Sequence, residues 1–197
     1  MADWIEAAVE GEVDAAVVER LAVHVGISVS AIYGKSGKSL VKKRIDNYNN
    51  AAQFRPWLVL VDLDNEFSCA PDLISDWLPN PASFMRFRVA VREVEAWLMA
   101  DHERFASFLA VKPSVIPANP ETLAEPKQVV VNLARYSRRR AIRDDMVPRP
   151  GSGRTVGPAY VSRLIEYIRD VKDGWRPNIA ASGASSLAKC LRSLASL

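Results

Sequence analysis

The segment Trp57-Leu58-Val59-Leu60-Val61, which follows Pro56 and leads directly into Asp62-Leu63-Asp64, constrains the fold more than any other part of the chain. Five consecutive apolar residues without polar alternation are typical of a strand that is covered on both faces. Strands of this kind belong to parallel sheets with helices packed on each side. We therefore expect an α/β protein in which residues 57–61 form a central strand.

Neighbouring segments alternate between strand and helix patterns. Strands are predicted where apolar or β-branched residues cluster, at Ile5 to Glu10, 27–33, 57–61 and 84–91. Helices are predicted between and after them, at 12–25, 38–50, 71–77, 93–109, 127–140, 160–171 and 185–197. This order predicts about four strands in a mainly parallel sheet with right-handed crossovers. We expect residues 1–110 to form the α/β core and 111–197 a helical extension packed on it, within one compact domain.

Composition excludes several classes of protein. Hydrophobic residues make up 49% and charged residues 25%, which is ordinary for a globular chain and unlike a disordered one. The net charge of +3 permits contact with nucleic acid but is low for a protein that coats DNA. No apolar run is long enough to cross a bilayer, and no signal peptide is evident. With Cys69 and Cys190 far apart and only His24 and His102 as imidazoles, we expect a cytoplasmic protein without a zinc site.

Acidic residues follow the predicted strands at the points where these end. Glu10 ends the first strand, Asp62 and Asp64 end the third, and Arg92, Glu93 and Glu95 follow the fourth. The carboxyl ends of parallel strands share one edge of the sheet, so these carboxylates should converge. Their mutual repulsion would be relieved by a hard cation such as Mg²⁺ or Mn²⁺. The Asp-x-Asp spacing by itself is also found in turns and helix caps.

Several short motifs resemble those of one known family. Glu10-Gly11-Glu12-Val13-Asp14 resembles the Glu-Gly-x-x-Asp opening of Toprim domains, and Leu60-Val61-Asp62-Leu63-Asp64 is similar to the second Toprim motif. The segment 92–101, Arg-Glu-Val-Glu-Ala-Trp-Leu-Met-Ala-Asp, resembles a signature of the bacterial Toprim-like family called domain of unknown function 4276. This likeness continues at 119–123, Pro126-Lys127, 156–158 and Trp175-x-Pro177, so it spans nearly the whole chain.

The resemblance implies a Toprim-like fold and a magnesium-dependent chemistry of phosphodiesters, as in nucleases of the overcoming-lysogenization-defect type. By this analogy Asp62 and Asp64 hold Mg²⁺ or Mn²⁺, and Glu10 is a further ligand or the group that transfers a proton. Asp14 and Glu66 would hold a second metal or lie in the outer shell. Family members are often encoded beside ATPases in bacterial defence loci, which suggests an ATPase partner. No tyrosine is placed as a topoisomerase nucleophile, and the additional modules of a primase are missing.

Basic residues suggest where a nucleic acid could bind. The loop Gly34-Lys35-Ser36-Gly37-Lys38-Ser39 lacks the P-loop spacing because Ile32 stands where a glycine is required, but Lys35 and Lys38 could contact a backbone phosphate. The alternative for this loop is a plain turn. Arg92 is a further candidate, and so is the run Arg138-Arg139-Arg140, which could equally be a solvated or partner-facing helix surface. Glu95 is either a site residue or a structural partner of Arg92 and backbone amides.

Three functions are compatible with these patterns. The leading hypothesis is a magnesium-dependent nuclease, acting on nucleic acid in a defence system with an ATPase partner. The first alternative is a non-catalytic Toprim-fold subunit that binds and regulates an ATPase. The second is a phosphoacceptor or phosphatase-like domain that uses Asp62, which explains Glu10 poorly.

Overall fold

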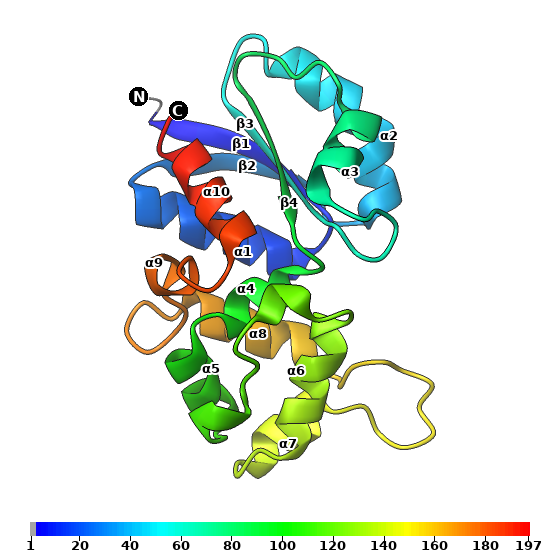
Figure 1. Cartoon of the computed structure of the whole chain (residues 1–197), viewed down its shortest axis with the longest axis vertical. Coiled ribbons are helices and arrows are strands. Elements are labelled where there is room, and N and C mark those ends of the chain that lie inside the picture. Colours follow the sequence, from blue (N-terminus) through cyan, green and yellow to red (C-terminus); the bar gives the residue numbers. More distant parts are fainter. Residues whose placement is uncertain (1–2) are drawn as a thin grey trace.

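The computed structural model describes residues 3–197 and contains a four-stranded sheet in which every neighbouring pair of strands is parallel (Figure 1). The sheet order is β2-β1-β3-β4. The strands are β1 (Trp4–Val9), β2 (Ser28–Gly34), β3 (Trp57–Asp62) and β4 (Met85–Ala90). This arrangement confirms the predicted α/β class with a parallel sheet, flanking helices and a helical C-terminal extension, and it is consistent with a Toprim-like fold.

The position of β3 explains its apolar sequence. It lies between β1 and β4, and all six of its residues are buried. Leu58 and Leu60 contribute to the core on one face of the sheet, whereas Val59 and Val61 contribute to the core on the other. A strand covered on both faces has no position where a polar side chain would reach water until it ends at Asp62.

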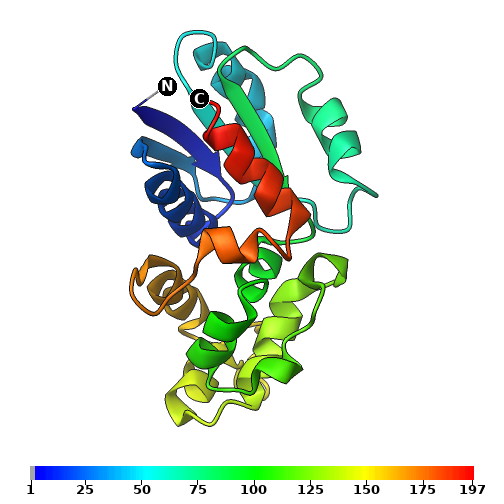
Figure 2. The same cartoon turned by 60° about the vertical axis from the view of Figure 1, so that its left-hand side comes forward.

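Each face of the sheet is covered by two helices. Helices α1 (Glu12–Val25) and α10 (Ser185–Leu194) pack on one face (Figure 2). Helices α2 (Lys38–Ala51) and α3 (Ala70–Trp77) pack on the other. The C-terminal helix α10 therefore returns from the helical half of the molecule to complete the sheet half, beside β4.

The remaining helices form the lower half of Figure 1. They are α4 (Val94–Met99), α5 (His102–Leu109), α6 (Pro126–Arg135), α7 (Arg140–Met146), α8 (Tyr160–Arg169) and α9 (Pro177–Ala180), with 3-10 turns at Pro113–Val115 and Pro120–Thr122. Trp97 and Trp175 are fully buried among them, and the Trp175 indole N–H donates to the Trp97 carbonyl at 3.1 Å. The apolar core of these helices is continuous with that under α1 and α10. Within residues 3–197, no helix combines the length and apolar character needed to cross a membrane.

The predicted single helix at 93–109 is divided in two at Asp101, whose φ and ψ of −86° and 72° are not helical. The Asp101 carboxylate is fully buried and accepts bonds from the Arg176 backbone N–H at 3.0 Å and from Arg176 Nε at 2.9 Å. A tertiary ion pair with a residue 75 positions away thus overrides the local helix pattern.

The predicted helix at 127–140 is also divided, because α6 ends at Arg135 and α7 begins only at Arg140. In the link between them the Arg138 backbone N–H donates to the Ala110 carbonyl at 3.2 Å. The Ser137 hydroxyl accepts from the Arg139 N–H at 3.1 Å. These two bonds replace those that a continuous helix would make.

Candidate functional site

The carboxyl ends of β1 and β3 bring Glu10 and Asp62 together. The Asp62 backbone N–H donates to Glu10 Oε1 at 2.8 Å. The Asp62 side chain points toward α4, where its Oδ1 accepts from the Val94 N–H at 3.0 Å. Three segments of chain therefore meet at this edge of the sheet, which lies at the junction with the helical half.

Four carboxylates form what we call the inner cluster. Asp14 and Glu95, in the first turns of α1 and α4, join Glu10 and Asp62. Burial, which disfavours a charged carboxylate, raises the pKa of Glu10 to about 7. Burial and the charge of Glu95 raise the pKa of Asp14 to about 7. Burial and then the charges of Asp14, Glu95 and Glu10 raise the pKa of Asp62 well above its ordinary value, so ionising all four carboxylates together is costly.

Two oxygens of the inner cluster have no hydrogen-bond partner although they are buried. They are Asp14 Oδ1 and Glu95 Oε2. The other oxygen of Glu95 accepts from the Tyr160 hydroxyl at 3.2 Å. Buried acceptors of this kind are normally satisfied, so an unpartnered pair in one acidic cluster suggests that a cationic or donor group can bind there.

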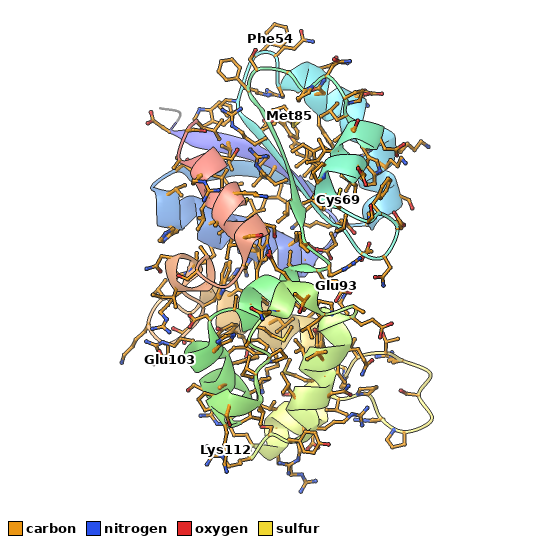
Figure 3. The ribbon with its side chains drawn as sticks, viewed as in Figure 1. Phe54, Cys69, Met85, Glu93, Glu103 and Lys112 are labelled. Carbon is orange, nitrogen blue, oxygen red and sulfur yellow. The ribbon has the colours of Figure 1, made fainter. Side chains whose placement is uncertain are left out.

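Lys127 places a cation beside the inner cluster. Its Nζ lies 3.5 Å from Glu93 Oε1 and 3.8 Å from Glu95 Oε1, and its backbone N–H donates to Glu93 Oε2 at 2.6 Å. Burial by itself would lower the pKa of Lys127, but the charges of Glu95 and Glu93 outweigh burial and raise it. Figure 3 labels Glu93 at the junction of the two halves of the molecule.

Sequence reasoning did not assign Lys127 or Tyr160 to the site. A signal existed for Lys127, because it is the second residue of α6, where the helix dipole disfavours a cation. A lysine at this position needs a compensating anion. Nothing in the local sequence around Tyr160 points to Glu95, which lies 65 residues away.

Asp64 and Glu66 lie outside the inner cluster and are paired with Lys38. Lys38 Nζ is 2.8 Å from Asp64 Oδ2 and 3.4 Å from Glu66 Oε2. The Lys38 side chain is only 12% exposed. Of the predicted metal ligands, Glu10, Asp62 and Asp14 thus gather in one place. Asp64 and Glu66 are instead neutralised by Lys38, which is also a candidate for phosphate contact.

Arg92 supports the loop after β3. Its guanidinium donates to the Asp64 carbonyl at 2.7 Å and to Asn65 Oδ1 at 3.2 Å, while the Asp64 N–H donates to the Arg92 carbonyl at 2.9 Å. Both Asp64 and Arg92 have positive φ, at 52° and 64°. Strained non-glycine residues of this kind cluster at functional sites when the surroundings hold them in place.

The loop from Gly34 to Lys38 is fastened to the end of β1. Gly34 has a φ of 89°, and a Cβ there would lie 2.2 Å from the Val9 carbonyl oxygen. The Lys35 N–H donates to that carbonyl and the Gly37 N–H to the Glu10 carbonyl, both at 2.9 Å. Two backbone donors of this loop are therefore engaged within the protein, and Lys35 itself is 3.3 Å from Glu12 Oε2.

The arginine run lies far from the inner cluster. Arg138, Arg139 and Arg140 are exposed in the link before α7 and at its start, at the end of the helical half that is distant from the sheet (Figure 1). Arg138 Nε donates to the Ala110 carbonyl at 3.4 Å, and Arg140 Nε is 3.2 Å from Asp144 Oδ2.

The donor set of the inner cluster suits a hard divalent cation, since its members are all carboxylates and two of the oxygens are buried without a partner. The present arrangement is less complete than a formed metal site. Among residues 3–197, no group of three or more His, Cys, Asp or Glu side chains is arranged to hold a metal ion. The chemistry of the residues fits such a cation, while coordination by three of them requires their side chains to turn.

A pocket of about 280 Å³ opens beside the inner cluster. Asp14, Glu95, Lys127 and Tyr160 line it, together with Thr155 and Val156 from the loop before α8. The unpartnered carboxylates therefore border a space that a small ligand or a ligand end can enter.

Comparison with known proteins gives no match, so a function has to be inferred from this geometry. No protein-family model matches the chain. No curated protein matches it. No solved structure matches it either.

Proposed function

We propose that this chain is a magnesium- or manganese-dependent phosphodiester hydrolase that acts on nucleic acid. The observation that carries the proposal is the inner cluster, in which four carboxylates meet at the carboxyl edge of a parallel sheet and two oxygens, Asp14 Oδ1 and Glu95 Oε2, are buried without a partner. Ligands of open α/β sheets bind at this edge. The Toprim resemblance of the Glu10 and Asp62 motifs supports the same assignment.

Glu10, Asp14 and Asp62 would hold the cation, and Glu95 is placed to contribute a fourth carboxylate. When bound, the cation would neutralise the phosphoryl oxygens and activate a water. Asp64 and Glu66 would reach a second cation only by releasing Lys38, to which both are paired. Lys127 offsets part of the negative charge in the absence of substrate.

Hydrolysis requires that a water oxygen bond to phosphorus, that the bond from phosphorus to the leaving oxygen break, and that a base take the proton of the water. Glu10 is the candidate base where Asp14, Asp62 and Glu95 hold the cation without it. Its Oε1 is fixed by the Asp62 N–H, and burial raises its pKa to about 7, which suits a general base near neutral pH.

The proposal extends to partners and location. The ATPase partner follows from the family resemblance, and a non-catalytic subunit that regulates such an ATPase is the rival role of the same fold. A cytoplasmic location is supported by the two cysteines of the chain, Cys69 and Cys190, both of which are free thiols.

The test is to incubate the pure protein with supercoiled plasmid, linear single-stranded DNA and tRNA, with Mg²⁺ or Mn²⁺ and with or without EDTA. We expect cleavage that requires the metal and is lost in the double variant Asp14→Asn/Asp62→Asn. Asp46→Asn, at an exposed position on α2, is the matched control and should cut like the unmodified protein.

Cleavage by Asp14→Asn/Asp62→Asn at the normal rate would contradict the assignment, and so would cleavage that persists in EDTA. If the unmodified protein cuts none of these substrates, even after an ATPase encoded beside it is added, the rival role of a non-catalytic subunit replaces the nuclease.

A further inference from the structure

A second feature of the molecule is a groove of about 600 Å³ along the free edge of the sheet, where β4 has no neighbouring strand in the described chain. The floor is β4, including Met85, which Figure 3 labels. One wall is α10, which lies beside β4 in Figures 1 and 2. The other wall contains Ile74 and Pro81. The charged and hydroxyl residues of this basic groove are Arg86, Arg88, Lys189, Arg192, Ser193 and Ser196.

The positive charge of the basic groove is uncompensated. Within residues 3–197, none of its four cationic side chains forms an ion pair. Arg86 is held by neutral oxygens instead, with Nε 3.3 Å from the Ser193 carbonyl and a terminal nitrogen 3.0 Å from the Ser83 carbonyl. Arg88 is bonded to the Ser193 hydroxyl. Two guanidinium groups are thus fixed in place and free of any anion, which is the preorganisation that favours binding of an anionic ligand.

An added peptide strand is disfavoured at this edge. Such a strand would need the outward backbone carbonyls of β4 as acceptors. The Met85 carbonyl already accepts from Arg86 at 3.2 Å, and the Phe87 carbonyl from Arg88 at 3.4 Å. An extended peptide also presents side chains to one face only at alternate residues, whereas a nucleic-acid strand carries a phosphate on every nucleotide.

The spacing of the cations suits a row of phosphates. Arg86 and Arg88 are two residues apart on a strand, or about 7 Å. Lys189 and Arg192 are about one turn apart on the exposed side of α10. Phe87, the aromatic residue of the lining, is buried and stacked on Trp77 with ring centroids 5.9 Å apart, so it offers no face to a base.

We infer that the basic groove binds the phosphate backbone of a single nucleic-acid strand, without reading its sequence. The lining of the groove reaches Arg88 on β4, and β4 ends at Ala90, at the edge of the sheet where the inner cluster lies. A nucleic-acid strand that continued along β4 past the groove would therefore approach that edge. This inference rests on the proposed function, for which it names the substrate class and the path of the substrate.

Binding is measured by fluorescence anisotropy of a labelled single-stranded DNA of mixed sequence, in EDTA so that no cleavage occurs, over a series of NaCl concentrations. The test variant is Lys189→Glu/Arg192→Glu, whose two side chains are exposed. We expect affinity to fall at least about tenfold, and the slope of log affinity against log salt to flatten by about 1.4, because each phosphate contact to a single strand contributes about 0.7. Arg192→Gln, which removes one charge without reversing it, should show about half of this slope change.

The matched control is Lys112→Glu/Lys172→Glu, which changes the net charge equally at two exposed lysines outside the groove. Unchanged binding by Lys189→Glu/Arg192→Glu, or the same loss in the control, would overturn the inference. Polyglutamate that displaces the DNA at equal charge concentration would do so too, by showing that the groove accepts any acidic chain.

The nuclease proposal and the groove proposal can be rejected independently of each other. Asp14→Asn/Asp62→Asn should bind the DNA as well as the unmodified protein does. Normal binding without cleavage by the unmodified protein would reject the nuclease and keep the groove. Cleavage that is unaffected by the α10 variants would reject the groove and keep the nuclease.

Discussion

The backbone N–H of Asp62 holds the Glu10 side chain, through a 2.8 Å bond to Oε1 between residues 52 positions apart. Because the donor is a main-chain group, this bond survives replacement of either the Asp62 or the Asp14 side chain. The carboxylates of the inner cluster can therefore be removed by substitution while Glu10 keeps its position. Substitutions in the cluster can therefore be studied by measurements of stability as well as of activity.

The double variant Asp14→Asn/Asp62→Asn should be more stable than the unmodified protein when no metal is present. Each substitution keeps the shape of the side chain and removes a buried carboxylate that must either carry a charge beside its neighbours or take up a proton at a cost. We expect the free energy of unfolding near neutral pH to rise by about 1–3 kcal/mol. Urea denaturation in EDTA measures this free energy. A loss of stability would show that the carboxylates of Asp14 and Asp62 make favourable interactions in the folded protein.

The same double variant should lose its response to metal. A cation that binds the folded protein and not the unfolded chain stabilises the former in proportion to its affinity. Mn²⁺ should therefore raise the melting temperature of the unmodified protein and of Asp46→Asn, but not that of Asp14→Asn/Asp62→Asn. An equal rise in all three proteins would place the metal elsewhere.

Stability of the metal-free protein should fall as the pH rises through the range of about 4 to 7. In the folded state the pKa values of Glu10 and Asp14 are both raised to about 7, from ordinary values of 4.5 and 3.8. Between the two sets of values the folded protein binds more protons than the unfolded chain, so the free energy of unfolding decreases with increasing pH. We expect a loss of about 2 kcal/mol or more between about pH 5 and pH 7.5, measured by urea denaturation in EDTA.

The double variant and saturating Mg²⁺ provide the controls for this pH dependence. Both should reduce it. In the double variant Asp14 no longer titrates, although Glu10 still does, and in saturating Mg²⁺ the cation favours the charged carboxylates. A stability that increases over the same pH range in EDTA would show that the raised pKa values do not apply to the folded protein.

Lys127→Met tests the lysine whose Nζ lies 3.8 Å from Glu95 of the inner cluster. Loss of its charge leaves Glu93 and Glu95 without their nearest cation, and the Lys127 side chain is 44% exposed, so we expect a destabilisation of only about 1–2 kcal/mol near neutral pH. The effect should shrink as the pH falls, because burial raises the pKa of Glu95 and this carboxylate takes up a proton before an ordinary glutamate would. Lys172→Met, at an exposed position, should change stability by less than about 0.5 kcal/mol.

Metal affinity separates this electrostatic role of Lys127 from a purely structural one. Since Lys127 competes with a cation for the same carboxylates, Lys127→Met should bind Mn²⁺ more tightly, by about threefold to tenfold at low salt. Calorimetric titration measures the change. Weaker binding by the variant would mean that Lys127 positions the ligands and does not compete with the metal.

The parts of the fold that were predictable from sequence are those where local pattern and tertiary environment agree. The apolar residues of β3 are buried on both faces, so their pattern alone placed the strand and its terminal Asp62. The break at Asp101 was not predictable, because it depends on Arg176, and the break after Arg135 depends on the Ala110 carbonyl. The position of Lys127 beside Glu95 likewise arises from packing of α6 on α4, which no spacing in the sequence encodes.

The Asp-x-Asp pattern shows the limit of sequence reasoning at the site itself. Asp62 and Asp64 are two residues apart, yet Asp62 is at the end of a strand and Asp64 is in a loop with a φ of 52°. The loop conformation turns Asp64 toward Lys38 at 2.8 Å, whereas Asp62 faces the N–H of Val94. Two carboxylates that look equivalent in the sequence therefore have different partners.

Gly34 offers a test of how the loop after β2 positions the edge of the sheet. Gly34 and Gly26 both have a positive φ, 89° and 81°, so alanine at either is strained by about 1–2 kcal/mol. They differ in space, because a Cβ at Gly34 would lie 2.2 Å from the Val9 carbonyl oxygen, whereas nothing lies within 4 Å of a Cβ at Gly26. Gly34→Ala should therefore lower the free energy of unfolding, measured by urea denaturation, by at least about 2 kcal/mol more than Gly26→Ala does. It should also weaken Mn²⁺ binding, since displacement of Val9 moves the adjoining Glu10, and Gly26→Ala should not. Equal effects of the two substitutions would mean that the loop can shift without a cost in stability and does not fix the position of Glu10.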